Sequence, residues 1–473
     1  MTEALAALER RIAEDLERIE AMPREWMPAR IGPDGAPLHN VVIVGAGLSG
    51  LSVAFGLKRQ SVANVLVIDR SAEGREGPWV TCARMDTLRS PKHLTGPDLG
   101  LPSLTYRSWY EAQHGGEAWD AVGKIDRADW MDYLNWYRRV TGIAVRNRTE
   151  LEAITPYGDI LALDVTTPQG RQRIHTRKLV LATGIEGAGG LLVPGFVRDG
   201  LPRERWTHSG EPIDAARLAG LDVGIVGAAA SAFDWAVAAL RAGARSATLF
   251  ARSSEFPRTE VLAWTNFPGF LGHFADLDSL RRWRFMRRVF DLKVPPTQEM
   301  YRAAHAFPGF RTELGCGPTA ATLEDGRIRL DTPRGAFRFD HLLLGTGYEI
   351  DLARRPELAP FAGEIALWQD RFTPPPGEED EALARYPFLG SSFEFLEKTP
   401  GRASFLANIH VFNNGAVPSL GPICNGITGL KYGAPRMVSA LVRGLFLADA
   451  DDYYSDLMRY DEAHFEPADT GQP

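Results

Sequence analysis

The sequence predicts an α/β fold built from two Rossmann-like dinucleotide-binding units, with the second inserted into the first. Two stretches carry this prediction, because each shows a β-rich run, a turn of small residues, a helical run and another β-rich run. They span residues 41–70 (VVIVGAGLSG to VLVIDR) and 222–252 (DVGIVGAAASAFD to ATLFAR). Similar strand ends, LATG at 181–184 and GTGY at 345–348, flank the second stretch. The chain is therefore expected to leave the first unit and later return to it.

Each glycine of the first turn has a separate expected task. Gly45 lets the chain turn sharply out of the strand, and Gly47 lets the backbone approach a pyrophosphate. Gly50 lets the following helix pack closely on the sheet. Asp69 ends the second strand, where a carboxylate can hold a ribose hydroxyl. These features predict an adenine dinucleotide site rather than a glycine-rich turn in an ordinary α/β domain.

The second stretch differs from the first at two positions. Arg252, followed by Ser253 and Ser254, stands where the first stretch has Asp69. An arginine suits a ribose 2′-phosphate and an acid selects a free 2′-hydroxyl, so this unit is expected to prefer NADPH over NADH. Ala229 stands at the place of the middle glycine, and its Cβ should keep a pyrophosphate slightly further away. The alternative is a structural βαβ unit without a ligand.

The other elements follow from hydrophobic periodicity. Apolar residues at helical spacing predict an amphipathic helix from near Leu5 to before Pro23, either docked on its own unit or forming a homodimer contact. We predict strands at 41–44, 65–68, 178–184, 222–226, 247–251 and 337–344, and helices at 51–59, 129–140, 233–241 and from near Pro435. Segments 144–146, 151–154 and 160–165 are predicted to form a β-meander.

These elements imply four parts of the chain. The predicted parts are an N-terminal helical extension at 1–37, a first dinucleotide unit at 38–186 and 338–461, a second unit at 187–337, and a flexible tail at 462–473. Residues 255–330 match no motif.

Composition and charge exclude several classes of protein. A formal net charge of −7 over 473 residues, without a basic stripe, argues against nucleic-acid binding. Cys82, Cys316 and Cys424 lie far apart, so neither a dithiol redox centre nor a metal site is predicted. No apolar run approaches the ~20 residues that span a bilayer, and the N-terminus has no apolar leader. We therefore predict a cytoplasmic protein.

The long loop after the first stretch is expected to be functional, because long ordered loops in compact domains usually are. In GPW at 77–79, a planar indole follows a flexible backbone, and it either lies against a flat ring or fills the core. Arg84, Lys92 and His93 either meet an anionic group or are solvated. Near the end, the glycine-rich stretch 405–433 precedes a helix whose N-terminus is suited to stabilise negative charge.

Seven short segments, taken in this order, resemble the flavin-dependent monooxygenases with two dinucleotide-binding domains. They are VGAGLSG at 44–50, GPW at 77–79, YLNWY at 133–137, LATG at 181–184, His208 with Ser209, GAAASAFD at 227–234 and GTGY at 345–348. That group comprises flavin-containing monooxygenases, Baeyer–Villiger monooxygenases and amine N-hydroxylases. The resemblance spans roughly residues 38 to 460.

The resemblance implies FAD on the first unit and NADPH on the second. It further implies that NADPH reduces the flavin, that O2 then forms a 4a-(hydro)peroxyflavin, and that one oxygen atom enters a small organic substrate. N-, S- and Baeyer–Villiger-type oxygenation all stay open. The alternatives are an NADPH-dependent flavoprotein reductase or dehydrogenase without oxygenation, and a non-catalytic flavin-binding protein. Disulfide reductases are disfavoured, because no cysteine pair is present.

Together, the motifs and the resemblance predict the site residues. We expect the cofactors to be held by Gly45, Gly47, Ser49, Gly50, Asp69, Arg70, Trp79, Thr183, Gly184, His208, Gly227, Ala229, Ser231, Arg252, Ser253 and Gly347. Lys92, Arg84 and Asn413 are the predicted catalytic residues around the flavin.

Overall fold

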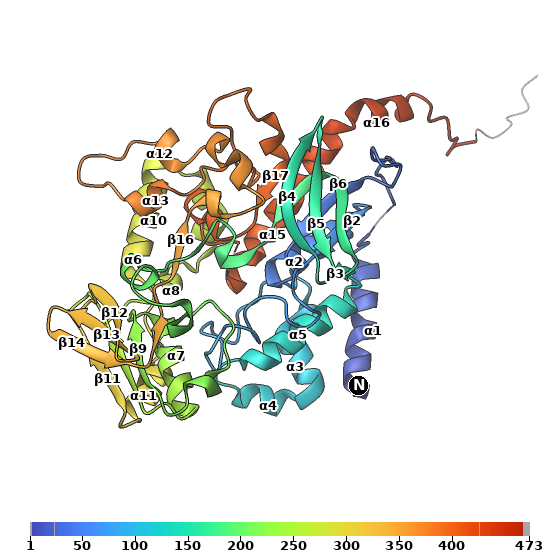
Figure 1. Ribbon diagram of the computed structural model, residues 1–473. Helices are drawn as coiled ribbons and strands as arrows, with labels where there is room; N and C mark the ends of the chain where they lie inside the picture. Colours follow the sequence, from blue (N-terminus) through green and yellow to red (C-terminus); the bar gives the residue numbers. More distant parts are fainter. Residues whose placement is uncertain (1, 23, 425, 467–473) are drawn as a thin grey trace, which may run out of the picture.

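Two separate sheets organise the chain in the computed structural model, which describes residues 2–22, 24–424 and 426–466. One sheet contains β1 to β6 and β17, and the other contains β8 to β11 and β15 (Figure 1). All strand pairs of the second sheet and the pairs around β1 are parallel. The predicted α/β fold with two Rossmann-like units is confirmed.

The first sheet has the order β3-β2-β1-β6-β5-β4, and β17 also pairs with β6. Its strands are β1 (His39–Val44), β2 (Val65–Ile68), β3 (Val145–Arg146), β4 (Glu150–Tyr157), β5 (Ile160–Thr167), β6 (Gly170–Leu181) and β17 (Ile409–Val411). The predicted meander is correct for β4 and β5, which pair antiparallel, and β5 also pairs antiparallel with β6. It is wrong for β3, which pairs in parallel with β2 through Val67 and Val145. A local pattern cannot reveal so distant a partner.

Two helices lie beside the first sheet. They are α2 (Leu48–Arg59), which packs on β1 and β2, and α15 (Ile427–Ala448), which packs against α2. The start predicted for α15 near Pro435 is wrong, because Pro435 lies inside the helix. Glycines 429 and 433 explain the earlier start. A Cβ at these positions would lie 2.3 Å and 2.1 Å from the carbonyl oxygens of Pro422 and Ile423. These two glycines belong to the stretch that was predicted to precede the helix. They instead lie in its first turns and let it pack closely on the preceding chain.

The second sheet has the order β11-β10-β9-β15-β8. Its strands are β8 (Trp206–His208), β9 (Asp222–Val226), β10 (Ser246–Phe250), β11 (Phe310–Glu313) and β15 (His341–Leu344), and α7 (Ala230–Arg241) follows β9. A separate antiparallel sheet contains β12 (Ala320–Glu324), β13 (Arg327–Thr332) and β14 (Gly335–Phe339).

The single strand predicted at 337–344 is two strands, β14 and β15, which belong to different sheets. Asp340 separates them, and its carboxylate and its N–H both bond the backbone of Asp222. Because β15 pairs with β9, the second sheet extends to Leu344. The chain returns to the first sheet only at β17, through the short ribbon of β7 (Gly189–Leu191) and β16 (Tyr348–Ile350).

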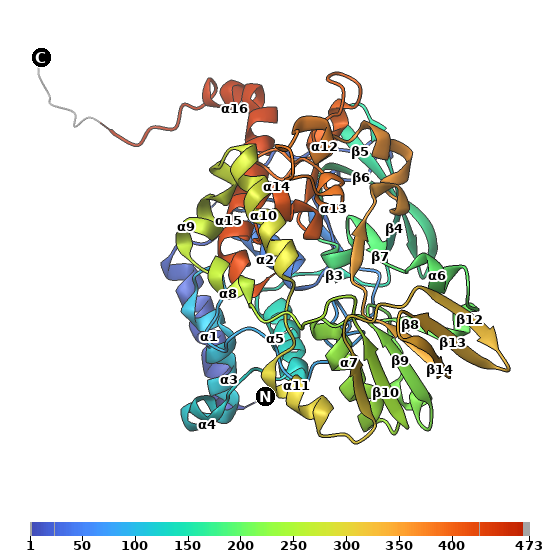
Figure 2. The ribbon, with the colours of Figure 1, turned by 90° about the vertical axis from the view of Figure 1, so that its left-hand side faces the viewer.

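The N-terminal helix, α1 (Glu3–Arg18), is docked on its own chain (Figure 2). Leu5, Ile12 and Leu16 are buried. Glu9 accepts a hydrogen bond from Trp136 Nε1 at 3.0 Å. The first of the two predicted alternatives therefore describes the structure, and the homodimer contact gains no support. Pro23, before which the helix was predicted to end, lies outside the described residues.

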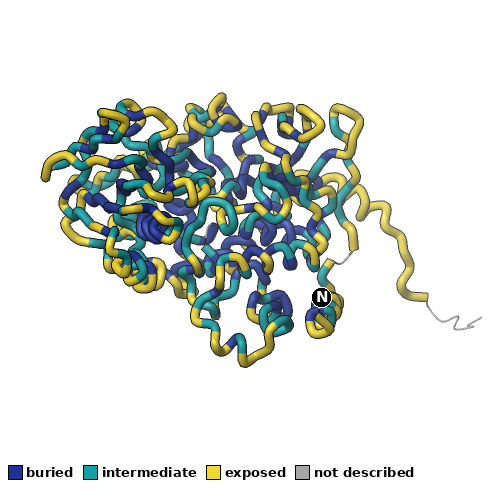
Figure 3. Tube along the Cα trace, turned by 60° about the horizontal axis from the view of Figure 1, so that its bottom comes forward, coloured by how far each residue is buried: buried dark blue, intermediate teal, exposed yellow. Residues whose placement is uncertain are grey.

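The remaining helices lie around these sheets. They are α3 (Tyr106–His114), α4 (Gly116–Ala121), α5 (Arg127–Val140), α6 (Gly195–Arg198), α8 (Val261–Thr265), α9 (Pro268–His273), α10 (Ser279–Leu292), α11 (Gln298–His305), α12 (Trp368–Arg371), α13 (Glu381–Ala384), α14 (Val417–Leu420) and α16 (Ala450–Leu457). Figure 3 shows the buried chain inside the body and the exposed chain along its outline. None of the helices in the described residues is long and apolar enough to cross a membrane.

His410 on β17 should make the fold sensitive to acid. Its ring is fully buried, Nδ1 lies 2.8 Å from the carbonyl oxygen of Ser392, and burial lowers its pKa to about 4. The unfolded chain therefore takes up this proton at a higher pH than the folded chain does, and stability is lost as pH falls below about 6.5. We expect the titration of His410 to lower the free energy of unfolding by about 2 kcal/mol between about pH 7 and pH 5.

Urea unfolding at these two pH values measures the effect. The variant His410→Gln keeps a donor for the Ser392 carbonyl but does not titrate, so its stability should change less with pH. An equal pH dependence of variant and natural protein would contradict this role of His410.

Candidate functional site

The first cradle, the turn between β1 and α2, depends on glycines for its shape. Gly45 has φ +105°, and its N–H donates to the Ile68 carbonyl at 2.8 Å. A Cβ there would lie 2.3 Å from the Ala182 carbonyl oxygen, and one at Gly50 would lie 1.8 Å from the Gly45 carbonyl oxygen. Both glycines are therefore required by the fold itself.

Gly47 is different, because no described part of the protein requires a glycine there. Its φ is −71°, and a Cβ would lie 3.9 Å from its nearest neighbour, Gly77 Cα. Within the described residues, no acceptor takes the N–H groups of Leu48 and Ser49 at the start of α2. Free amides beside unfilled space suit a pyrophosphate, so the residues present fit the dinucleotide that the sequence predicts.

Asp69 closes this cradle at the end of β2. Its carboxylate is buried and accepts hydrogen bonds from the N–H groups of Ala46 at 2.8 Å and Ser71 at 2.7 Å. Each carboxylate oxygen has two lone pairs, so one remains on each for a ribose hydroxyl. Asp69 therefore shapes the turn and can also accept from the ribose.

The second cradle repeats this construction between β9 and α7. Gly227 has φ +124°, and its N–H donates to the Phe250 carbonyl at 2.9 Å. A Cβ there would lie 2.3 Å from the Gly345 carbonyl oxygen, just as Gly45 faces Ala182. Ala229 precedes α7 with φ −85°, close to the value at Gly47.

One contact distinguishes the second cradle from the first. The N–H of Ala230 donates to the carbonyl of Val294 at 3.4 Å, so the segment between α10 and α11 reaches the start of α7. Ser231 follows on α7, and its hydroxyl has no hydrogen-bond partner among the described residues.

Arg252 is exposed after the end of β10, as the sequence predicts. Its guanidinium forms no hydrogen bond or ion pair with any described residue, so it is free to meet a 2′-phosphate. A Cβ at position 317 would lie 2.4 Å from Arg252 Cγ, so Gly317 makes room for the side chain. Ser253 is exposed and its hydroxyl accepts from the N–H of Glu255 at 3.2 Å.

The predicted residues on the first unit lie in different surroundings. The Ser49 hydroxyl donates to the Cys424 carbonyl at 2.7 Å, tying α2 to the chain before α15. The Trp79 indole is half-buried and meets Trp130 edge-on, with ring centres 6.2 Å apart. The Arg70 side chain is 62% exposed, and its ion pairs with described residues are long, at 4.0 Å to Glu150 and 3.9 Å to Glu186.

Three predicted residues, Gly184, Gly347 and His208, lie where the chain passes from one sheet to the other. Gly184 has φ +73° and Gly347 has φ +83°. His208 ends β8, and its Nδ1 accepts from the Gly210 N–H at 3.0 Å. Its ring meets Tyr348 edge-on at 5.8 Å, and burial lowers its pKa. These groups border the ribbon of β7 and β16.

Comparison with known proteins identifies the family. Residues 42–186 match a model of FAD-NAD(P)-binding proteins, and residues 121–289 match a model of L-lysine 6-monooxygenases and L-ornithine 5-monooxygenases. An FAD-dependent urate hydroxylase of Xanthomonas campestris pv. campestris is 41% identical over 470 residues, which cover 98% of this chain and 97% of that protein. The chain belongs to the flavin-dependent monooxygenase family. It is therefore an oxidoreductase, and FAD with a nicotinamide dinucleotide are its cofactors, as predicted.

Two solved structures have a similar fold. An ornithine hydroxylase from Pseudomonas aeruginosa superposes with a TM-score of 0.67, at 18% identity, over 86% of this chain and 100% of that one. An L-lysine 6-monooxygenase from Pseudomonas syringae gives a TM-score of 0.63, at 17% identity, over 86% and 99%. At this identity the likeness shows that the monooxygenase shares their fold.

The predicted catalytic cations of the monooxygenase are both held by backbone carbonyls. Lys92 Nζ donates to the carbonyls of Trp119 at 2.6 Å and Asp120 at 3.2 Å. Arg84 Nη2 donates to the Ile213 carbonyl at 2.5 Å, and its guanidinium lies 4.7 Å over the Trp235 ring. Neither side chain is therefore a solvated charge on a loop, which was the alternative that the sequence left open. Their catalytic roles stay predictions.

Asn413, the third predicted catalytic residue, is buried with both ends of its amide bonded. Its Nδ2 donates to the Leu181 carbonyl at 3.2 Å and to the Thr183 hydroxyl at 3.0 Å, and its Oδ1 accepts from the Gly415 N–H at 2.8 Å. It therefore ties the end of β6 to the end of β17.

We expect Asn413→Ala to destabilise the monooxygenase by about 1–3 kcal/mol, because several buried polar groups lose their partner. Urea unfolding measures this loss, and flavin absorbance shows whether the folded variant keeps FAD. If the variant folds and binds FAD but its turnover per bound flavin is far below that of the natural protein, Asn413 acts in the reaction as predicted. If it stays near normal, its task is structural.

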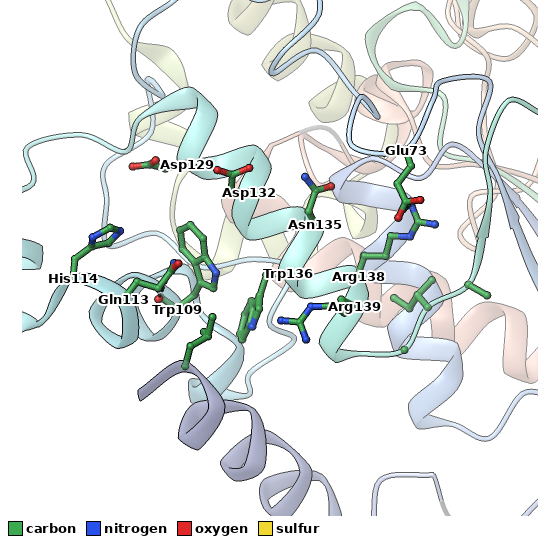
Figure 4. A pocket seen from close by; sticks show the side chains of 14 residues that line it. Glu73, Trp109, Gln113, His114, Asp129, Asp132, Asn135, Trp136, Arg138 and Arg139 are labelled. Carbon is green, nitrogen blue, oxygen red and sulfur yellow. Dashed lines mark hydrogen bonds and ion pairs between the residues drawn. The ribbon is translucent and has the colours of Figure 1, made fainter. Parts of the chain in front are cut away.

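The monooxygenase also has a cleft of about 910 Å³ along α5 (Figure 4). Trp109 and His114 come from α3, Asp132 and Arg139 come from α5, and Glu73 comes from the loop after β2. None of the predicted site residues lines this cleft. The candidate site is therefore defined by the two cradles, which lie elsewhere on the molecule.

Proposed function

We propose that this monooxygenase uses FAD and NADPH to hydroxylate urate, with O2 as the source of the oxygen atom. The observation that carries the proposal is the 41% identity to an FAD-dependent urate hydroxylase over 98% of the chain. That likeness spans both cradles and all segments between them, so it is not limited to the dinucleotide motifs that many flavoproteins share.

The residues of the two cradles support this proposal. The free amides that open α2 and the carboxylate of Asp69 would hold the FAD pyrophosphate and ribose. The free guanidinium of Arg252 would hold the 2′-phosphate of NADPH. When bound, FAD accepts hydride from NADPH and activates O2 for transfer of one oxygen atom to the substrate. The chain's own part is to orient the two dinucleotides and to keep water from the reacting atoms.

Amine N-hydroxylation is the second candidate. It is favoured by the match of residues 121–289 to the model of lysine and ornithine monooxygenases. That match covers a smaller share of the chain than the likeness to the urate hydroxylase does, so we rank it second. L-Lysine and L-ornithine are therefore the natural comparison substrates.

Oxygen uptake by the purified holoenzyme tests these functions side by side. With NADPH present, urate should stimulate O2 uptake, and urate, NADPH and O2 should disappear in equal amounts. Labelled O2 should place one oxygen atom in the product. NADPH oxidation that makes hydrogen peroxide and leaves urate intact would overturn the proposal. Stimulation by L-ornithine or L-lysine would favour the second candidate, and turnover only with added electron acceptors would indicate a reductase.

A further inference from the structure

One loop borders the first cradle and also binds the helix that starts at the second cradle. It runs from Gly77 to Lys92 after β2, beside α7 in Figure 1. At its start, Gly77 Cα lies 3.9 Å from the position of a Cβ at Gly47, so the loop borders the first cradle. Its middle is bound to α7, the helix that starts at the second cradle. We call residues 77–92 the bridging loop.

Two ion pairs fix the bridging loop to α7. Arg89 Nη2 donates to Asp234 Oδ2 at 2.5 Å, and the Asp234 side chain is only 7% exposed. Arg241 Nη1 donates to both carboxylate oxygens of Asp86, at 2.8 Å and 2.7 Å, in an exposed pair.

A third contact adds an aromatic surface. The Arg84 guanidinium lies over the ring of Trp235 and donates to the Ile213 carbonyl, which precedes β9. Positions 234 and 241 are seven residues apart, so they lie two turns apart on one face of α7. The bridging loop therefore follows one face of this helix over most of its length.

The two units also touch away from the bridging loop. Phe270 and Trp283, from the helices between β10 and β11, pack in the same core as the first sheet, and Lys124 pairs with Glu299 on α11 at 3.1 Å. The chain passes from one sheet to the other through the ribbon of β7 and β16. The sheet that carries the second cradle can still rock relative to the first sheet unless contacts near α7 hold it, because domains within one chain commonly move relative to one another. The contacts of the bridging loop on α7 oppose such rocking.

We propose that Arg89 and Asp234 are positioning residues, which hold the NADPH unit in the orientation from which hydride reaches the flavin. The proposal rests on the proposed use of NADPH as hydride donor. Loss of Arg89 should be costly, because the buried Asp234 carboxylate would lose its charged partner. Burial raises the pKa of Asp234, and Arg89 opposes that change.

Anaerobic reduction of the flavin by NADPH tests this proposal without any substrate. In Asp234→Asn and Arg89→Gln, we expect normal FAD content and an NADP⁺ dissociation constant within about threefold of normal. The limiting rate of flavin bleaching should fall by about 10-fold or more, while dithionite still bleaches the flavin fully. Hydrogen exchange should become faster in residues 77–92 and in α7.

The exposed pair supplies a test that does not disturb the interior. Asp86→Arg and Arg241→Asp should each slow bleaching by NADPH, and the double variant should restore it because the ion pair re-forms with reversed charge. Arg284→Ala is the matched control, since Arg284 forms a similar two-bonded pair with Glu378 away from the bridging loop.

Two results would overturn the positioning role. One is bleaching at the normal rate with normal hydrogen exchange in every variant of the bridging loop. The other is a loss confined to NADP⁺ affinity. Failure of NADPH to bleach the natural protein would instead refute the proposed function, so the two failures are distinguishable.

Discussion

Gly47→Val is expected to give a folded, colourless protein that holds no FAD. The fold tolerates a side chain at this position, because φ is −71° and the nearest neighbour of a Cβ would be Gly77 Cα at 3.9 Å. The added methyl groups would instead occupy the place of the pyrophosphate. Overpacking costs about 1–3 kcal/mol even where neighbours adjust. Here neither backbone nor phosphate can yield, so FAD should bind at least ~100-fold more weakly.

Flavin absorbance after purification, together with circular dichroism, measures both parts of this prediction. Gly50→Ala is the matched control for folding, because its Cβ would lie 1.8 Å from the Gly45 carbonyl oxygen. That variant should lose stability or fail to fold, whereas Gly47→Val should keep its secondary structure. A yellow Gly47→Val protein with full FAD occupancy would show that the pyrophosphate lies elsewhere.

Arg252→Ala should lower the catalytic efficiency with NADPH by about 10- to 150-fold. Its guanidinium has no partner among the described residues, so its removal disturbs no internal contact. The loss of a charge-assisted hydrogen bond to the 2′-phosphate corresponds to about 1.5–3 kcal/mol. NADH lacks that phosphate, so its efficiency should change less than about twofold.

The two efficiencies can be compared by stopped-flow reduction of the flavin with each nucleotide. Arg338→Ala is a suitable control, since Arg338 is a surface arginine that pairs with Glu324. It should leave both nucleotides unaffected. Equal losses with NADPH and NADH in Arg252→Ala would mean that Arg252 does not contact the 2′-phosphate.

The parts of the fold that could be predicted from the sequence are those set by local backbone geometry. Gly45 and Gly227 have positive φ and face a carbonyl just beyond the end of a neighbouring strand, so no other residue fits. Asp69 and Arg252 occupy a fixed position at the end of a strand. Both cradles and their different charges were therefore readable from the chain.

The parts that could not be predicted depend on distant partners. The carbonyl that binds Arg84 belongs to Ile213, which lies 129 residues away. The partner of Arg89 lies 145 residues away, and sequence reasoning passed over this pair entirely. No local signal separates such an arginine from a solvated one. For Lys92 and Arg84 the charge was noticed, but its partner was not.

The order of the segments along the chain has a consequence for biosynthesis. The second sheet uses only strands between Trp206 and Leu344, so a ribosome releases all of it in one continuous piece. The first cradle can be completed only much later in synthesis. Its sheet gains β17 only from residue 409 onwards, and the Ser49 hydroxyl bonds a carbonyl 375 residues later. Units fold as their segments emerge. The unit that begins first along the chain is thus completed last, so we expect FAD to be captured only near the end of synthesis.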